Sequence, residues 1–205
     1  GTWGVKMVDM ENDGDVDIVA SIYKDDEIVF FENDGSLSFT RNVILSGILE
    51  PRRAIPADLN GDGDIDIAYS ASDDDLIGQL INDGSQNFTD EVIDTGLDFA
   101  IGVTPVDLNN DDQLDLLIGN GGSQNQILVY ENRINSWTGE VNTAWETTGN
   151  WSQNAVPSIN NSVVIPDRSN DPEVNSSATG NDFEIQTGAV LTINSEWTLQ
   201  VVESI

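Results

Sequence analysis

A nine-residue acidic segment occurs three times in this chain at a fixed spacing of 49 residues, and this repeat restricts how the chain can fold. Each copy has oxygen-bearing side chains at its first, third, fifth and ninth positions and runs directly into an apolar segment. A compact loop that wraps a hard cation and then begins a strand has this arrangement. Repetition at this period predicts similar supersecondary units along the chain. The three segments are Asp9–Asp17, Asp58–Asp66 and Asp107–Asp115.

Strand-like segments flank each acidic loop. A short apolar segment precedes the loop, and a β-rich run such as Ile18–Ser21 follows it. A third strand ends in an Asp-Gly turn in the first two copies, and a last strand begins at Phe39 and again at Phe88. Three to four strands in each unit of this length are typical of a β-propeller blade. We therefore predict an all-β protein in which residues 1–133 form three blades of an incomplete propeller.

The charge balance excludes two classes of partner. The chain carries 37 acidic against 7 basic side chains, has no histidine, and has a net charge of −30. A nucleic-acid partner needs a basic footprint, and an anionic membrane attracts basic segments, so neither is expected here. The simpler explanation of the acidic composition is solubility or adaptation to a salty environment. The alternative is divalent cation binding, and 13 of the acids lie inside the three loops.

The ligand chemistry of the loops favours calcium, which takes six to eight oxygen ligands from alternating positions of a compact loop. We expect up to three structural Ca²⁺ ions, with a backbone carbonyl as the ligand at the seventh position of each loop. Glycine at the sixth position of the first two loops suits a turn that needs positive φ, whereas Asp112 takes that place in the third. The predicted ligands are Asp9, Glu11, Asp13, Asp15 and Asp17 in the first loop, Asp58, Asn60, Asp62, Asp64 and Asp66 in the second, and Asp107, Asn109, Asp111, Gln113 and Asp115 in the third.

Other metal sites fit the loops less well. An EF-hand needs a bidentate Glu at the twelfth position, where this chain has Ala20, Tyr69 and Ile118. Magnesium prefers few protein ligands and several waters, and zinc would need His or Cys, both of which the sequence lacks. Asx-rich turns without an ion are the remaining alternative. Carboxylates held this close without a cation would repel one another, so we expect the ions to be structural.

The composition changes after residue 133, and we predict a second β-domain over residues 134–205. Four of the five tryptophans lie in it. Apolar residues recur eight apart in two series, and both series alternate with polar residues and turns. This pattern fits the successive faces of a β-solenoid, or a sandwich-like meander of hairpins. The two series are Phe183, Leu191 and Leu199, and Ile185, Ile193 and Val201.

The acidic loop, the Ile/Leu-rich strand after it and the Phe-Glu-Asn-Asp-Gly turn resemble FG-GAP/VCBS repeats over residues 1–132. These repeats are the calcium-carrying blades of integrin-α-like propellers and of large bacterial surface proteins. The resemblance implies blades with calcium in the loops and no shared catalytic activity. Complete propellers of this family have about seven blades, so we expect further blades from a longer parent chain.

Residues 137–205 resemble, less specifically, a Trp-rich module of large secreted bacterial adhesin-like proteins. The matching segments include Trp137–Gly139, Asn150–Ser152 and Gly188–Ile193. In such proteins the module leads into β-helical segments. Its tryptophans either close the end of the β-core or form a sugar-binding platform, and we expect the first.

We therefore expect a non-enzymatic, calcium-stabilised segment of a secreted or cell-surface protein, with a role in adhesion or as a structural stalk. Candidate partners are glycans and surface proteins, and no stretch is apolar enough for membrane insertion. The alternative is an accessory region of a secreted polysaccharide-active enzyme whose catalytic domain lies outside this chain. Catalysis within these residues is not expected, because His and Cys are absent and the paired carboxylates have cation geometry. The exposed acids Asp73, Asp74 and Asp75 are interpreted as a solvated loop, with a glycosidase-type carboxylate pair as the competing interpretation.

Overall fold

The computed structural model describes residues 1–201 except 111–112, 124, 154 and 159–160. The protein is all-β, as predicted, with a single 3₁₀ turn (η1, Thr148–Asn150) among the described residues. By their internal contacts the described residues divide into two compact units, one of which holds residues 1–108 and 113–131 and the other residues 109–110 and 132–201. Each unit is described by itself. No helix in the described part of the chain has the length and apolar character needed to cross a membrane.

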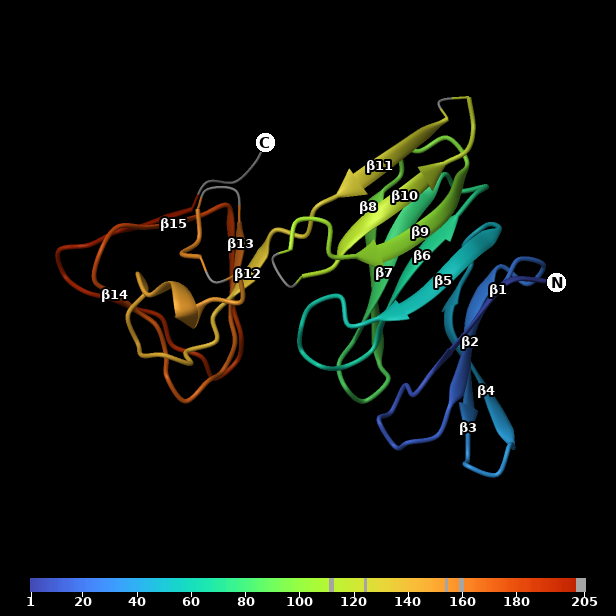
Figure 1. Ribbon diagram of the computed structural model, residues 1–205, viewed down its shortest axis with the longest axis horizontal. Helices are drawn as coiled ribbons and strands as arrows, with labels where there is room; N and C mark the ends of the chain where they lie inside the picture. Colours follow the sequence, from blue (N-terminus) through green and yellow to red (C-terminus); the bar gives the residue numbers. More distant parts are fainter. Residues whose placement is uncertain (111–112, 124, 154, 159–160, 202–205) are drawn as a thin grey trace. The chain divides into compact units, whose positions relative to one another are not determined.

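The first unit consists of three open antiparallel sheets, one for each repeat, and we call them blades 1, 2 and 3 (Figure 1). Blades 1 and 2 have four strands in sequence order, and blade 3 has three among the described residues. This arrangement is consistent with an incomplete propeller-like fold. Blade 1 holds β1 (Thr2–Val8), β2 (Asp17–Ile22), β3 (Glu27–Asn33) and β4 (Phe39–Ser46); blade 2 holds β5 (Pro51–Ala57), β6 (Asp66–Ala71), β7 (Leu76–Asn82) and β8 (Phe88–Asp94); blade 3 holds β9 (Ala100–Val106), β10 (Asp115–Asn120) and β11 (Gln126–Tyr130).

The hydrophobic cores of this unit lie between blades. The first strands of successive blades are neighbours, since β5 contacts both β1 and β9. One cluster joins blade 1 to blade 2 through residues such as Phe30 and Tyr69, and a second joins blade 2 to blade 3 through residues such as Ile77 and Ile118. All four of these side chains are at most 1% exposed. The second strand of blade 2, β6, is buried on both sides because blade 2 has a neighbouring blade on each face.

The second unit is built from short parallel strand pairs that enclose one core. Three sheets are formed, β12–β13–β16, β14–β17 and β15–β18, and every pairing in them is parallel. Paired residues such as Ser162 and Asp182 lie about 20 positions apart, so the chain passes three faces before it returns to the first. Parallel pairing excludes a meander of hairpins and identifies the predicted solenoid. The strands are β12 (Ile134–Ser136), β13 (Ser162–Ile165), β14 (Glu173–Val174), β15 (Ala178–Gly180), β16 (Asp182–Ile185), β17 (Thr192–Ile193) and β18 (Leu199–Val201).

Three tryptophans fill the core of the second unit. Trp137, Trp145 and Trp151 are at most 1% exposed. The Trp151 ring lies edge-on to both others, with centroids 5.0 Å from Trp137 and 4.5 Å from Trp145. Its indole N–H donates to the carbonyl of Trp145 at 2.8 Å. A fully buried ring cannot stack on a sugar, so the sugar-platform interpretation is wrong for these three residues, and they form the β-core as expected.

Candidate functional site: the acidic loops

The aspartate at the ninth position of the first loop joins two distant parts of blade 1. Asp17 begins β2 and is fully buried. One carboxylate oxygen accepts the backbone N–H of Met10 at 2.8 Å, and the other accepts that of Asn33 at 2.9 Å. The Asn33 side chain in turn donates to the carbonyl of Val16 at 3.1 Å. One buried side chain thereby connects the start of the acidic loop to the end of β3.

The same connection recurs in blade 2. Asp66 is fully buried and accepts the N–H groups of Leu59 at 2.9 Å and Asn82 at 2.8 Å. In the third loop Asp115 is 1% exposed and accepts the N–H of Leu108 at 3.1 Å. This anchoring role was not predicted. The anchoring role is compatible with the predicted role as a metal ligand, because each carboxylate oxygen has a second lone pair that a cation could use.

The first and fifth side chains of the first loop hydrogen bond to its own backbone. Asp9 accepts the N–H groups of Asp13 at 3.0 Å and Gly14 at 2.9 Å. Asp13 accepts the N–H of Asp15 at 2.8 Å. These contacts are Asx-type turns, in which a short carboxylate replaces a backbone acceptor. They hold the loop in a fixed path around its acidic side chains.

The second loop repeats these contacts with small changes. Asp58 accepts the N–H groups of Gly61 at 2.7 Å and Gly63 at 3.0 Å, and Asp62 accepts that of Asp64 at 2.9 Å. The third position, an asparagine here, joins the same network. Its side-chain oxygen accepts the N–H of Asp62, and its amide donates back to the Asp62 carboxylate. The two loops are therefore the same local structure.

Two glycines in each of the first two repeats shape the loop. Gly14 and Gly63, at the sixth position, have φ of 93° and 94°, as the turn argument predicted. The other glycine lies in the hairpin after the third strand. A Cβ on Gly84 would come within 2.5 Å of a carboxylate oxygen of Asp64, and Gly35 bears the same relation to Asp15. The seventh side chain of the first two loops, Asp15 and Asp64, thus points at the neighbouring hairpin, which is compatible with the prediction that its backbone carbonyl is the metal ligand.

Two acids of these loops have raised pKa values. Burial, followed by the nearby Asp17 carboxylate, raises the pKa of Glu11 to about 7. One oxygen of the Glu11 carboxylate is buried and has no hydrogen-bond partner among the described residues. Burial also raises the pKa of Asp66 to about 6, although its two backbone N–H donors act in the opposite direction. The neighbouring charges of Asp62 and Asp58 add to the rise.

The third loop can be compared only in part. Asp107, Asn109 and Gln113 belong to the described residues, whereas the predicted ligand Asp111 lies outside them, as does Asp112. Asp115, which ends this loop, is buried like Asp17 and Asp66.

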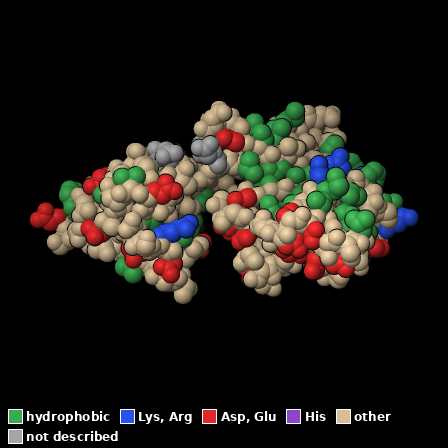
Figure 2. Space-filling model, turned by 60° about the horizontal axis from the view of Figure 1, so that its bottom comes forward, with side chains coloured by type: hydrophobic (Ala, Val, Ile, Leu, Met, Phe, Trp, Pro, Cys, Tyr) green, Lys and Arg blue, Asp and Glu red, His purple; other side chains and the backbone are tan. Residues whose placement is uncertain are grey.

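The loops contain oxygen ligands suited to calcium, but in this structure those oxygens already accept hydrogen bonds from backbone N–H groups. Every predicted ligand is an oxygen donor, which is the chemistry that Ca²⁺ prefers. In the view of Figure 2, acidic side chains are more abundant than lysine and arginine side chains. Yet within the described residues no group of three or more acidic side chains is arranged to hold a metal ion. In the first two loops the carboxylates accept backbone N–H groups, and their remaining lone pairs are the ones that a cation would use.

The acids of the β6–β7 hairpin have structural partners. Asp75 accepts the N–H of Phe99 at 2.7 Å, and Asp74 accepts the N–H of Leu49 at 2.5 Å. The interpretation as a merely solvated loop therefore misses their role as contacts between segments far apart in the sequence. A carboxylate used in this way is a poor candidate for the acid or the nucleophile of a glycosidase pair.

Comparison with known protein families gives two matches. An FG-GAP-like repeat family matches twice, over residues 9–69 and 58–118. Residues 136–205 match a domain of unknown function, DUF8693, which assigns no role to the second unit. Comparison with curated proteins gave no match. The two overlapping FG-GAP-like matches together span more than half of the chain and include all three acidic loops completely. The chain therefore belongs to the FG-GAP-like repeat family.

Proposed function

We propose that this chain is a non-catalytic, calcium-stabilised segment of an extracellular protein, with a role in adhesion or as a structural stalk. FG-GAP-like repeats are a non-catalytic repeat type and are typical of extracellular proteins. The observation that supports calcium most directly is the repetition of one acidic loop structure at a spacing of 49 residues. Each copy gathers carboxylates on a loop that joins two neighbouring strands.

In this proposal the cation would be held by the first, third, fifth and ninth side chains of each loop and by the seventh carbonyl. Its charge would offset the effects of burial and of the neighbouring Asp62 and Asp58 charges, which raise the pKa of Asp66. Since the loop connects the first and second strands of a blade, binding would fasten both strands to one centre. Extracellular modules bind calcium at roughly 10⁻⁴ to 10⁻³ M, so ordinary extracellular calcium would suffice.

Calcium is expected to raise the melting temperature of the first unit by about 10 °C or more, because each site filled well above its dissociation constant adds about 2–3 kcal/mol. Differential scanning calorimetry with excess calcium and with excess chelator measures this effect. Magnesium at the same concentration is the control, and it should give a much smaller shift. Equal midpoints with calcium and chelator would refute the calcium proposal.

Without calcium, the free energy of unfolding is expected to fall as pH rises from about 4 to about 7. Asp66 and Glu11 have folded-state pKa values of about 6 and about 7, against ordinary values of 3.8 and 4.5. The folded state therefore holds protons that the unfolded state has released in this window, and this contribution to stability is lost as pH rises. For Asp66 the loss is about 1–2 kcal/mol after allowance for the surrounding solvent.

Urea denaturation at several pH values in chelator measures this dependence. Asp66→Asn and Glu11→Gln should each flatten the curve, and saturating calcium should remove the decline because the cation favours the ionised loops. The acids with lowered pKa values, such as Asp34 and Asp83, act below pH 4 and with the opposite sign, so they do not mask the effect. A stability that rises between pH 4.5 and 7 in chelator would contradict the assignment.

A different assay tests the alternative that the chain is an accessory region of a polysaccharide-active enzyme. Incubation of the purified chain with a panel of polysaccharides, followed by analysis for new reducing ends, should give no cleavage. Glycan binding without cleavage would agree with the adhesion role. Cleavage that disappears in an Asp74→Asn, Asp75→Asn double variant would overturn the non-catalytic proposal.

A further inference from the structure

Two Asn-Gly dipeptides occur in this sequence, and the structure places them in different surroundings. Asn60-Gly61 lies in the second acidic loop, and Asn120-Gly121 lies at the end of β10. An asparagine before glycine is open to loss of its side-chain amide, because the backbone nitrogen of the glycine can attack the side-chain carbonyl carbon. Glycine has no Cβ to hinder that approach. The chain therefore contains two copies of one reactive dipeptide, and each serves as a comparison for the other.

The first dipeptide has a hydrogen-bond partner at each group that such a reaction changes. The attacking nitrogen is that of Gly61, and its N–H donates to a carboxylate oxygen of Asp58 at 2.7 Å. The side-chain oxygen of Asn60 accepts the backbone N–H of Asp62 at 3.0 Å. The amide nitrogen of Asn60, which is the leaving group, donates to the Asp62 carboxylate at 2.9 Å. The loop thus supplies a proton acceptor, a donor for the developing oxyanion and a partner for the leaving group.

The same dipeptide is open to water. Gly61 is exposed, and Asn60 is partly exposed. A Cβ placed on Gly61 would meet no atom within 4 Å, its chain neighbours apart. Ring closure onto the glycine nitrogen and the later entry of a water molecule both need this space.

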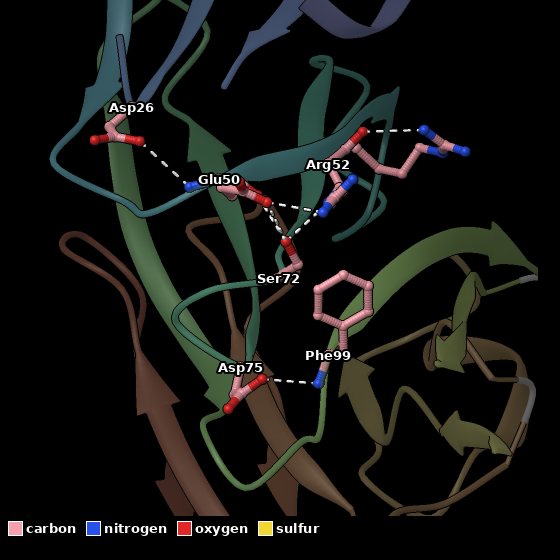
Figure 3. Close-up of polar contacts among 7 residues, drawn as sticks. Asp26, Glu50, Arg52, Ser72, Asp75 and Phe99 are labelled. Atoms are coloured by element: carbon pink, nitrogen blue, oxygen red, sulfur yellow. Dashed lines mark hydrogen bonds and ion pairs between the residues drawn. The ribbon is translucent and has the colours of Figure 1, made fainter. Parts of the chain in front are cut away.

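The second dipeptide lacks the base and the space. Asn120 is 3% exposed, and a Cβ on Gly121 would lie 2.7 Å from the side chain of Ile101. The Gly121 N–H donates to the backbone carbonyl of Phe99 at 3.0 Å, and a carbonyl does not take up the proton as a carboxylate does. Phe99 is itself held in place, because its own N–H donates to Asp75 at 2.7 Å (Figure 3). The Asn120 side-chain oxygen also accepts a backbone N–H, so the two sites do not differ in that respect.

We propose that Asn60 is a site of spontaneous deamidation in which Asp58 accepts the proton of the Gly61 nitrogen. That nitrogen bonds to Cγ of Asn60, the bond from Cγ to the amide nitrogen breaks, and ammonia leaves with the transferred proton. Water then opens the cyclic imide at one of its two carbonyl carbons, which gives aspartate or isoaspartate. One amide and one water become one carboxylate and one ammonium ion, so the reaction needs no oxidant or reductant.

The modification adds a negative charge at the third position of the loop, and its consequence for calcium rests on the proposed function. The first loop already has an acid, Glu11, at this position. Aspartate at position 60 would give the second loop the same acidic pattern and a tighter calcium site. Isoaspartate would lengthen the main chain there and weaken the site. The modification itself is detected without calcium, so failure of the calcium proposal and failure of this one are distinguishable.

Peptide mapping by mass spectrometry tests the proposal during incubation of the full chain at mildly alkaline pH in chelator, at a temperature where the chain is folded. Exchange of the amide for a carboxylate changes the mass of the peptide that contains it. Asn60 should react at least about tenfold faster than Asn120, which must wait for local opening of the strand end. In urea the two rates should become similar, because the dipeptides are the same. Equal rates in the folded chain, or reaction of Asn60 only in urea, would overturn the proposal.

Asp58→Asn separates the base from the hydrogen bond. The asparagine oxygen can still accept the N–H groups of Gly61 and Gly63, but it does not take up a proton. The rate at Asn60 should fall by about tenfold or more, since a positioned base contributes about 10²–10⁴-fold. Asp64→Asn is the matched control, because it removes one charge from the same loop at a side chain that points to the neighbouring hairpin. An unchanged rate at Asn60 in Asp58→Asn, or an equal fall in both variants, would overturn the role of Asp58.

Discussion

Replacement of Asp66 by alanine is expected to destabilise the first unit by about 2–4 kcal/mol, in chelator as well as in calcium. Asp66 is fully buried, and its two oxygens satisfy the N–H groups of Leu59 and Asn82. Alanine leaves both donors buried without an acceptor, and each such loss costs about 1–3 kcal/mol. Part of the cost is offset because a buried carboxylate with a raised pKa is removed.

Asp62→Ala is the matched control for this prediction, because Asp62 belongs to the same loop and is exposed. It should change the stability in chelator by less than about 1 kcal/mol and should reduce the stabilisation by calcium. Urea denaturation of both variants, with calcium and with chelator, gives the four free energies needed. If Asp66→Ala lost stability only in the presence of calcium, the residue would be a metal ligand without the anchoring role.

Replacement of Trp151 by alanine is expected to unfold the second unit while the blades stay folded. The substitution removes a ring that contacts Trp137 and Trp145 edge-on, and it frees a buried carbonyl that the indole N–H had satisfied. Loss of a buried tryptophan costs about 3–5 kcal/mol. A small unit with short strands has little stability beyond that amount.

Tryptophan fluorescence suits this measurement, because four of the five tryptophans lie in the second unit. A red-shifted emission should accompany an unchanged calorimetric transition of the blades. Trp197→Ala is the control, since Trp197 is 42% exposed, and it should shift the melting temperature by no more than a few degrees. If Trp151→Ala abolished the entire calorimetric unfolding transition, including that of the blades, the two units would unfold cooperatively.

The strands, turns and order of the blades could be predicted from the sequence because they rest on local signals repeated in register. Acidic loops followed by β-rich runs marked the second strands, and Asp-Gly turns marked the hairpins before Phe39 and Phe88. The solenoid could be predicted only as one of two options. Its eight-residue pattern places apolar residues on successive faces. Parallel pairing between strands about 20 residues apart produces no local sequence signal.

The anchoring role of the ninth aspartate could not be predicted from the loop alone. It depends on the backbone N–H of a residue on another strand, and pairing at that distance is decided by the assembled sheet. A signal did exist, because Asn33 follows Asp17 by 16 residues and Asn82 follows Asp66 by the same interval. A repeated pair of polar residues at both ends of two apolar strands points to a contact between the strand ends.

The placement of the apolar cores has a consequence for how this unit unfolds and how repeats can be added to it. Each core belongs to a junction between blades, so an open row of three blades has two cores. A closed ring has one core for each blade, whereas this open row has two thirds of a core for each blade. The terminal blades of an open row have one supporting neighbour and should exchange their amide hydrogens fastest. Ring closure would give the terminal blades a second neighbour and remove this difference in exchange rate. The gain in stability would be largest for the two terminal blades that the closure joins.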